Sequence, residues 1–241
     1  MKNLFRFVLI PSLILSFVSC KKDNYAPPGS FLTGRLLYNG DSIELERSQV
    51  SYQLYQSGFG KIGPIGSTFA QNGSYSQALF DGDYKLIIPN GQGPFMWKQD
   101  ANGNPDSLSI TMKGDQTVDL EVTPFYMVRN SQFAFSSGDS MITATFKAEK
   151  IITDPTMAKD IERVSLYINK TQFVSGGDNI AFTNLGGGSI TDPDNISLNV
   201  KVPFLDKVMA TSQDYIFARV GIKMVNVEDM IFSPVEKIQI K

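Results

Sequence analysis

Ile196-Ser197-Leu198-Asn199-Val200-Lys201-Val202 is the stretch of sequence that decides the fold of this chain. Apolar and polar side chains alternate through it without interruption. A period of two places all the apolar side chains on one face of an extended strand and the polar ones on the other. The stretch therefore predicts a strand of an antiparallel sheet, with one face buried and one face in solvent.

The same alternation recurs from Phe31 to the end of the chain. It is clearest in the ranges 50–55, 84–88, 108–112, 118–122, 142–147, 164–168 and 216–224. Turn signals such as Asn72-Gly73, which is typical of a hairpin, separate these ranges. No long range has a helical period, and Phe204–Thr211 is long enough for only a turn or two. The sequence predicts an all-β protein.

A boundary between two sets of strands falls near Thr123-Pro124. Short strands at such spacing, with Gly, Asn, Asp and Pro in the connections, favour β-sandwiches. We expect one sandwich over residues 31–123 and a second in tandem over residues 124–241. In the second, Asp214–Val220 resembles the tyrosine corner of immunoglobulin-like and fibronectin type III domains, and the alternative is a tyrosine that only packs.

The N-terminus has the parts of a secretory signal: two basic residues, Lys2 and Arg6, then an apolar run over residues 7–18, then Ser19-Cys20. The run is too short to span a bilayer, which requires ~20 apolar residues. Phe17-Val18-Ser19-Cys20 resembles the lipobox of bacterial lipoproteins, in which the cysteine is acylated and becomes the mature N-terminus, although leucine is usual where Phe17 stands.

We therefore expect a signal peptide over residues 1–19, a lipid on Cys20 and a flexible tether over residues 20–30. The alternative is a free thiol in an ordinary cleaved leader. Residues 21–30, Lys-Lys-Asp-Asn-Tyr-Ala-Pro-Pro-Gly-Ser, are polar and contain two prolines, as expected for a spacer.

Composition excludes several classes of function. The chain has no histidine and one cysteine, so the usual zinc, iron and copper sites and the nucleophiles that depend on histidine cannot be built. We expect no metal, no cofactor and no catalytic residues, although a carboxylate pair or a Ser-Lys arrangement remains open. The 22 basic and 24 acidic residues form no basic run, which argues against a nucleic-acid partner.

One long connection contains candidate residues for ligand binding. Flat aromatic rings pack against the C–H faces of sugars, while amides and carboxylates bind the hydroxyl groups. The candidates of these kinds are Gln92, Trp97, Gln99, Asp100 and Asn102. The alternatives for Trp97 are an anchor that covers one end of the first sandwich and a partner-docking residue.

Three other loops resemble binding motifs but lack necessary parts. The loop 100–106 spaces its oxygen atoms as a calcium loop does, but Pro105 stands where glycine is needed and Thr111 where glutamate is needed. The glycine-rich ranges 175–179 and 185–189 lack the lysine and the strand-to-helix context of a phosphate loop. We interpret all three as connections between strands.

Several segments resemble a known family. The ranges 32–38, 50–54, 72–76 and 80–86 follow the pattern of transthyretin-like, carboxypeptidase-regulatory-like domains. Together with the lipobox and with the ranges 21–25, 122–126, 166–174 and 219–223, the whole chain resembles a family of two-domain lipoproteins of unknown function. That family is encoded beside SusC/SusD-type glycan-uptake pairs of gut-dwelling Gram-negative anaerobes.

The resemblance implies a transthyretin-like sandwich followed by an immunoglobulin-like one, anchored by lipid to the outer membrane and facing the cell exterior. It implies a noncatalytic accessory to polysaccharide capture that binds glycan or docks to SusC/SusD-type transport proteins. Surface export signals often carry several acidic residues after the cysteine, whereas here Asp23 follows Lys21-Lys22. A structural or adhesive spacer is the alternative function, and a glycoside hydrolase is a remote one.

Overall fold

The computed structural model describes residues 26–58, 63–203 and 213–240. Within these ranges the chain is all-β apart from one 3-10 turn, η1 (Gly187–Ser189), which confirms the predicted fold class of two sandwiches in tandem. The predicted signal peptide, the lipidation site Cys20, the first part of the tether and the whole of Phe204–Thr211 lie outside the described residues.

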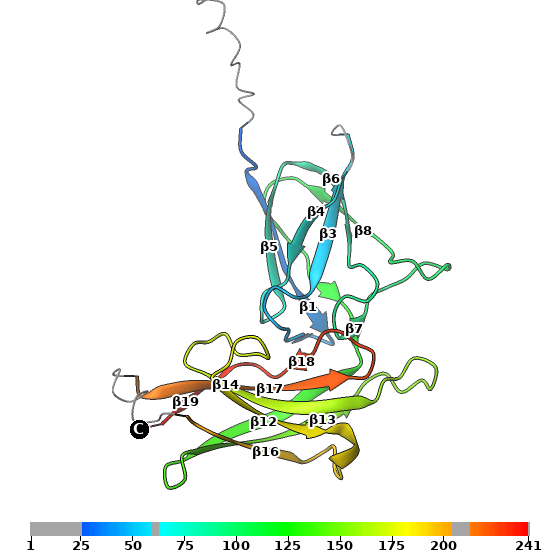
Figure 1. Ribbon diagram of the computed structural model, residues 1–241. Helices are drawn as coiled ribbons and strands as arrows, with labels where there is room; N and C mark the ends of the chain where they lie inside the picture. The colour runs from blue at the N-terminus through cyan, green and yellow to red at the C-terminus, as the bar shows by residue number, and fades with distance from the viewer. Residues whose placement is uncertain (1–25, 59–62, 204–212, 241) are drawn as a thin grey trace, which may run out of the picture.

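The N-terminal domain consists of two facing sheets and a short ribbon (Figure 1). The first sheet is built around β1 (Ser30–Tyr38), which pairs with β2 (Asp41–Ser42), β5 (Ser74–Leu79), β9 (Gln116–Thr117) and β10 (Leu120–Glu121). The second sheet has the order β4 (Ile65–Thr68), β3 (Ser51–Gln56), β6 (Gly82–Ile87) and β8 (Leu108–Met112). The ribbon pairs β7 (Phe95–Met96) with β11 (Thr123–Pro124).

The Asn72-Gly73 turn forms, but it does not make a hairpin. The amide nitrogen of Gly73 donates to the carbonyl oxygen of Ala70 at 2.9 Å, and Gly73 has a φ of +72°, which suits glycine. The strands on either side belong to different sheets, since β4 pairs with β3 and β5 pairs with β1. The turn therefore carries the chain from one layer of the sandwich to the other.

The C-terminal domain is a second sandwich of two antiparallel sheets. One sheet has the order β12 (Tyr126–Ser136), β13 (Met141–Lys150) and β16 (Ile196–Lys201). The other has the order β15 (Ala181–Gly186), β14 (Ile161–Asn169) and β17 (Tyr215–Met224), and β17 also pairs with β18 (Ile231–Phe232) and β19 (Glu236–Gln239). In β16 the residues Ile196, Leu198 and Val200 are buried and their neighbours are exposed, as the alternation predicts.

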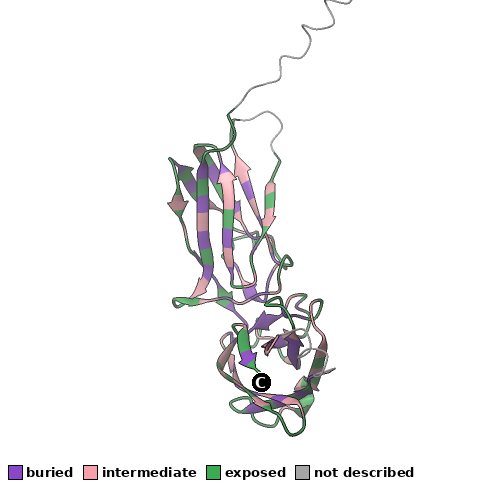
Figure 2. Ribbon diagram, turned by 90° about the vertical axis from the view of Figure 1, so that its left-hand side faces the viewer, coloured by how far each residue is buried: buried purple, intermediate pink, exposed green. Residues whose placement is uncertain are grey.

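The two domains meet end to face. In Figure 1 the strands of the N-terminal domain stand above the sheet that contains β14 and β17, while β12, β13 and β16 lie on its far side. The chain enters the N-terminal domain at the end remote from this junction. Figure 2 shows buried residues running from one domain into the other, and these apolar residues form one continuous cluster.

Candidate functional site at the domain junction

The middle of the sheet that faces the N-terminal domain is buried on both sides. In β14 the run from Val164 to Ile168 is buried without alternation, and in β17 the run from Ala218 to Ile222 is buried in the same way. A strand with one solvent face would expose every second residue. The outward-facing Ser165, Tyr167 and Arg219 are instead buried. Met230 and Phe232 of the same domain pack on Tyr167, and the loops of the N-terminal domain that contain Leu45 and Gln71 lie on Arg219.

Arg219 is the centre of this junction and has no exposed surface. Its Nε donates to the carbonyl oxygen of Ser233 at 2.7 Å, and its Nη1 donates to the carbonyl oxygen of Leu45 at 2.8 Å. Its Nη2 donates to Glu44 Oε2 and to the carbonyl oxygen of Gln71, both at 3.2 Å. Three of the four acceptors belong to the N-terminal domain, so one side chain of the C-terminal domain clamps two loops of its neighbour.

The surroundings of Arg219 are arranged for a buried cation. The guanidinium carbon lies 4.3 Å from the centroid of the Phe232 ring, a distance typical of a cation–π contact. Burial lowers the pKa of Arg219 to about 10, so the guanidinium stays charged at neutral pH. Burial raises the pKa of Glu44 to about 7 even though Arg219 and Arg35 act in the opposite direction.

Further contacts fix the junction around this clamp. Gln71 Nε2 donates to the carbonyl oxygen of Gln172 at 3.0 Å, and Gln71 Oε1 accepts from the amide nitrogen of Val174 at 3.3 Å. Asp229 Oδ2 accepts from the amide nitrogen of Gly93 at 2.8 Å. These bonds join the domains at separate points, so the relative position of the two sandwiches is well determined.

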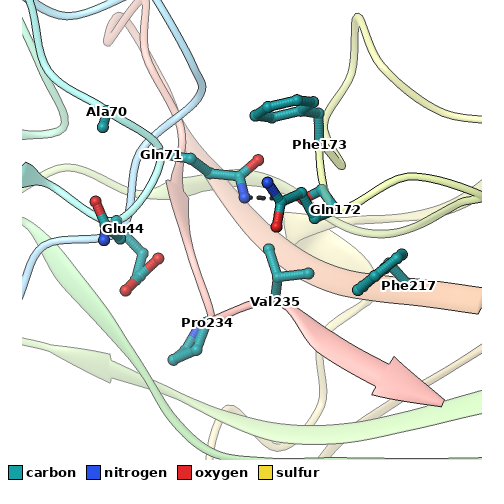
Figure 3. A pocket seen from close by; sticks show the side chains of 9 residues that line it. Glu44, Ala70, Gln71, Gln172, Phe173, Phe217, Pro234 and Val235 are labelled. Carbon is teal, nitrogen blue, oxygen red and sulfur yellow. Dashed lines mark hydrogen bonds between the residues drawn. The ribbon is translucent and has the colours of Figure 1, made fainter.

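A groove of about 430 Å³ opens beside the clamp, between the two domains (Figure 3). Its walls combine aromatic and aliphatic surface with amide and carboxylate groups. The lining residues are Glu44, Ala70, Gln71, Asn72, Gln172, Phe173, Phe217, Pro234 and Val235. The first four belong to the N-terminal domain and the other five to the C-terminal domain.

Phe173 is the most exposed aromatic side chain of the groove, at 36% of its surface. Arg47 lies over its ring, with the guanidinium carbon 4.4 Å from the ring centroid, and Arg47 also pairs with Asp178 at 3.6 Å. Phe217, in β17, lines the same C-terminal side of the groove. The groove therefore offers apolar ring surface together with the side-chain amide of Gln172, while both ends of the Gln71 amide already bond across the junction.

A second, smaller hollow of about 190 Å³ lies where the range 89–99 meets the C-terminal domain. Three of the five candidate residues from the sequence line this hollow, namely Gln92, Trp97 and Gln99. Asp100 and Asn102 do not line it and are exposed in the adjoining loop.

The candidate side chains are engaged within their own domain. Trp97 is 8% exposed, and its Nε1 donates to the carbonyl oxygen of Asp106 at 2.8 Å, which is the geometry of the loop-anchor alternative. Gln92 Oε1 accepts from the amide nitrogen of Ser51 at 3.0 Å. Asp100 Oδ1 accepts from the amide nitrogens of Asn102 and Asn104 at 2.8 and 2.9 Å, so it closes its own turn.

The glycine-rich ranges are structural connections. The range 175–179 folds on itself, with the amide nitrogen of Asp178 donating to Ser175 Oγ at 3.2 Å, and it touches the N-terminal domain through Gly177, whose amide nitrogen donates to Glu46 Oε1 at 3.3 Å. In the range 185–189, a Cβ on Gly187 would lie 1.8 Å from the carbonyl oxygen of Ile161. Close packing therefore explains the glycine at 187.

Within the described residues, no three His, Cys, Asp or Glu side chains gather as they would around a metal ion. The same residues contain no helix that is long and apolar enough to cross a membrane.

The residues that build the junction were not among the sequence candidates. Arg219 lies in two of the family-like segments, and the signal for its role is a charged side chain within an otherwise apolar range, Ile216 to Ile222, which indicates a covered outer face. Glu44, Gln71 and Phe173 carry no local signal, because each lies in a loop and they meet only through the packing of the two domains.

The fold and the junction define a tandem β-sandwich protein whose two domains are clamped together by a buried arginine. The chain belongs to the DUF3823 family. The family model described as "Protein of unknown function (DUF3823) N-terminal domain" matches residues 30–123, and the one described as "Domain of unknown function (DUF3823_C)" matches residues 126–237. The expectation of a two-domain family of unknown function is thereby confirmed.

Solved structures with the same architecture include two members of the family and one protein that is similar in fold. A DUF3823 family protein from Parabacteroides merdae is 31% identical, with a TM-score of 0.74 over 89% of this chain and 100% of that chain. One from Bacteroides ovatus is 28% identical, with a TM-score of 0.72 over the same shares of the two chains. A Bacteroides uniformis protein named "putative carbohydrate binding protein" is 16% identical, with a TM-score of 0.67 over 88% of this chain and 99% of that one. No curated protein matched the sequence.

Proposed function

We propose that this chain is a noncatalytic, lipid-anchored protein of the outer membrane, facing the cell exterior, that assists polysaccharide capture by binding glycan in the groove between its domains. Cys20 would carry the lipid, and the captured glycan would pass to a SusC/SusD-type transport pair. The single observation that carries the proposal is the groove itself, with Phe173 and Phe217 set among the amide groups of Gln71, Asn72 and Gln172.

The chemistry of the groove suits a sugar. The C–H face of a pyranose is apolar and packs on an aromatic ring, while its hydroxyl groups both donate and accept hydrogen bonds. Phe173 is partly exposed before any ligand arrives, so ring surface is available to be covered. A groove of about 430 Å³ has room for one or two sugar units, since small-molecule pockets measure ~300–1,000 Å³.

The similarity to solved structures supports the proposal only at the level of the fold. The Bacteroides uniformis protein named for carbohydrate binding shares the architecture at 16% identity. The stronger support from sequence is the resemblance to lipoproteins encoded beside SusC/SusD-type pairs, together with the lipobox that ends at Cys20.

Affinity-gel electrophoresis of the mature chain without its lipid, residues 21–241, tests the proposal. We expect retardation by at least one polysaccharide and a loss of affinity of about two- to fivefold for Phe173→Ala, since complete burial of a phenylalanine side chain contributes ~1.5–3 kcal/mol and a ligand would cover only the exposed part of this one. Phe182→Ala is the matched control, because Phe182 is 55% exposed on β15 and does not line the groove. An equal loss in both variants, or no retardation by any glycan, would contradict the proposal.

A docking or spacer function is the second candidate, and the clamp around Arg219 favours it. Four hydrogen bonds from one buried side chain fix the angle between the two sandwiches, as a stiff spacer would need. Co-purification with transport proteins in the absence of any glycan binding would support docking. The absence of both would favour the spacer.

A further inference from the structure

We propose that one side of the N-terminal domain rests on a zwitterionic lipid surface through the exposed side chains of Phe31 and Phe80. This inference rests on the proposed function, because it takes the lipid on Cys20 as given. It concerns a different surface from the groove, and it gives the anchored molecule one preferred side toward the membrane.

Phe31 and Phe80 form an exposed aromatic pair. Phe31 is 48% exposed and Phe80 is 38% exposed, the highest values among the large apolar side chains of the described N-terminal domain. In the antiparallel register of β1 and β5, Phe31 lies opposite Ala78, and Phe80 follows two residues later on the same face. Diagonal neighbours of this kind are within reach of each other when the side chains are aromatic. The two rings therefore form one apolar patch on the outer face of the sheet.

This patch lies at the end of the domain that the chain enters. β1 begins at Ser30 and β5 ends beside it at Leu79, because the two strands are antiparallel. Figure 1 shows this end remote from the domain junction. The nine residues from 21 to 29 span at most ~30 Å, so a lipid on Cys20 would hold the patch close to the bilayer. A tether of this length gives a high effective concentration, so a small apolar contact is enough to set the side that faces the lipid.

Hydrogen bonds hold both residues of the patch in place. The amide nitrogen of Phe31 donates to Asp115 Oδ1 at 2.7 Å, and the carbonyl oxygen of Phe80 accepts from the hydroxyl of Tyr84 at 2.9 Å. The start of β1 and the turn after β5 are thus fixed before any lipid is touched. A surface that is already ordered loses little conformational entropy on contact, which favours binding.

The charged residues beside the patch indicate the kind of lipid. Asp81, Asp115 and Lys113 are exposed at this end, so one negative charge is in excess. A strongly anionic surface would be repelled by the two carboxylates. A zwitterionic headgroup instead offers its ammonium group to them, while the aromatic rings reach the boundary of the acyl chains, as aromatic residues do at membrane interfaces.

Quenching of tryptophan fluorescence by brominated lipid tests which side of the domain touches the bilayer. The acylated chain is reconstituted into vesicles of phosphatidylcholine and phosphatidylethanolamine, with or without bromine on the acyl chains. Phe31→Trp places a reporter in the patch. Asp83→Trp is the matched control, because Asp83 is exposed at the same end of the domain but on β6, in the other sheet. Trp97 is common to all chains and is 8% exposed.

We expect bromine to quench the added emission of Phe31→Trp by roughly half, since apolar groups at an interface lie ~5–10 Å into the boundary between headgroups and acyl chains. The emission of Asp83→Trp and of the wild type should not change. Adding Phe80→Ser to Phe31→Trp should reduce the quenching, because the second ring no longer contributes apolar surface to the contact.

The outcomes separate this inference from the proposed function. Equal quenching of Phe31→Trp and Asp83→Trp would show a tether without a preferred side and would overturn the inference, as would quenching that Phe80→Ser leaves unchanged. An acylated Phe31→Trp chain that is not quenched would also overturn it, while retardation of its soluble form by a glycan would leave glycan capture in place. A wild type that carries no lipid would overturn both the contact and the proposed anchor.

Discussion

Arg219 places a full positive charge inside the protein, where it is stable only while its acceptors remain in position. Removing an ion from water costs several kcal/mol, and hydrogen bonds to charged acceptors must offset that cost. Here the offset comes from Glu44 and from backbone carbonyls of both domains. The charge of Arg219 is therefore stable only in the assembled junction, and the junction in turn depends on the four hydrogen bonds of Arg219.

Arg219→Met tests this dependence, since methionine keeps an unbranched apolar stem and removes the charge and all donors. We expect a loss of about 3–5 kcal/mol in the free energy of unfolding, because Glu44 and three carbonyl oxygens would stay buried without partners. This loss in the free energy of unfolding is measured by urea denaturation, followed by the fluorescence of Trp97, the only tryptophan of the chain.

Arg47→Met is the matched control at the same junction. Arg47 is 48% exposed and its partner Asp178 is 44% exposed, so the loss should stay below about 1 kcal/mol. If both methionine variants unfolded at the same urea concentration as the wild type, the clamp would not contribute to stability.

Glu44 makes the stability of the protein depend on pH in a definite direction. Burial raises its pKa from 4.5 to about 7, so between these values the folded chain holds a proton that the unfolded chain has released. The stabilisation is complete below about pH 4.5 and is lost as the pH rises to about 7, by at most about 1.4 kcal/mol per pKa unit.

Comparison with Glu44→Gln isolates this effect, because glutamine does not titrate. The wild type should lose stability relative to the variant as the pH rises from about 5 to about 8, measured as the difference in urea midpoint. Other titrating groups, such as Asp229, are common to both chains and cancel. A constant difference across that range would show that the pKa of Glu44 is not raised by burial.

Site residues were harder to predict from the sequence than the strands. Trp97 has the chemistry of a sugar platform, but its ring is 8% exposed and its indole nitrogen is satisfied by the backbone of Asp106. Composition gives the kind of side chain and not its exposure, which depends on what packs over it. Phe173 shows the opposite case, an unremarked loop residue that the fold leaves partly exposed.

At the scale of the element, side-chain alternation predicted the strands well, because it is a local property that the burial of one face enforces. Leu108–Met112 matches the range expected from the sequence, and Ile196–Lys201 ends one residue before the expected Val202. The partners of each strand were less predictable. Asn72-Gly73 fixes a local turn, but nothing in those residues specifies that the next strand joins the opposite sheet.

Gly34 in β1 is required by a close approach of backbone. A Cβ at this position would lie 1.9 Å from the carbonyl oxygen of Val118, which also accepts from the hydroxyl of Tyr75 at 2.6 Å. Gly34→Ala should therefore force β1 away from the 116–121 segment and lower the free energy of unfolding by about 1–3 kcal/mol or more, as overpacking does. Thermal denaturation followed by circular dichroism provides the measurement.

Gly66→Ala in β4 is the control for that substitution. Nothing lies within 4 Å of a Cβ at Gly66, and alanine is favoured over glycine inside a strand by ~0.5–1 kcal/mol. The control should match or exceed the wild-type melting temperature. A Gly34→Ala variant as stable as Gly66→Ala would mean that the backbone of residue 118 can move without cost.

At the scale of the whole molecule, the sequence indicates two sandwiches but not how they join. The interface uses the outer face of one sheet and the end loops of the other domain, and these residues are far apart in the chain, such as Leu45 and Arg219. From the sequence alone, both the outer face of this sheet and the end loops of the other domain would be assigned to the solvent-exposed surface. The hydrogen bonds that Arg219, Gln71 and Asp229 make across the junction show which surfaces the two domains share.

The same arrangement determines where a lipid on Cys20 would place the groove. The chain enters the N-terminal domain at the end remote from the junction, and β1, which has nine residues, spans ~30 Å along that domain. The nine residues from 21 to 29 could add up to ~30 Å if fully extended. An anchored molecule would thus present the groove well away from the membrane surface, where a long polysaccharide can reach it.

Cys20→Ala, expressed with its own leader in a Gram-negative host, tests the anchor on which this geometry depends. Without the thiol no acyl chain can be attached, so palmitate labelling should disappear and the protein should move from the membrane fraction to the soluble one. Ser19→Ala serves as the control, because it retains the thiol and a small residue before it, and it should stay labelled and membrane-bound. Labelling that persists in Cys20→Ala, or a wild type recovered unlabelled in the soluble fraction, would contradict the proposed lipid on Cys20. The placement of the groove away from the membrane would then lose its basis.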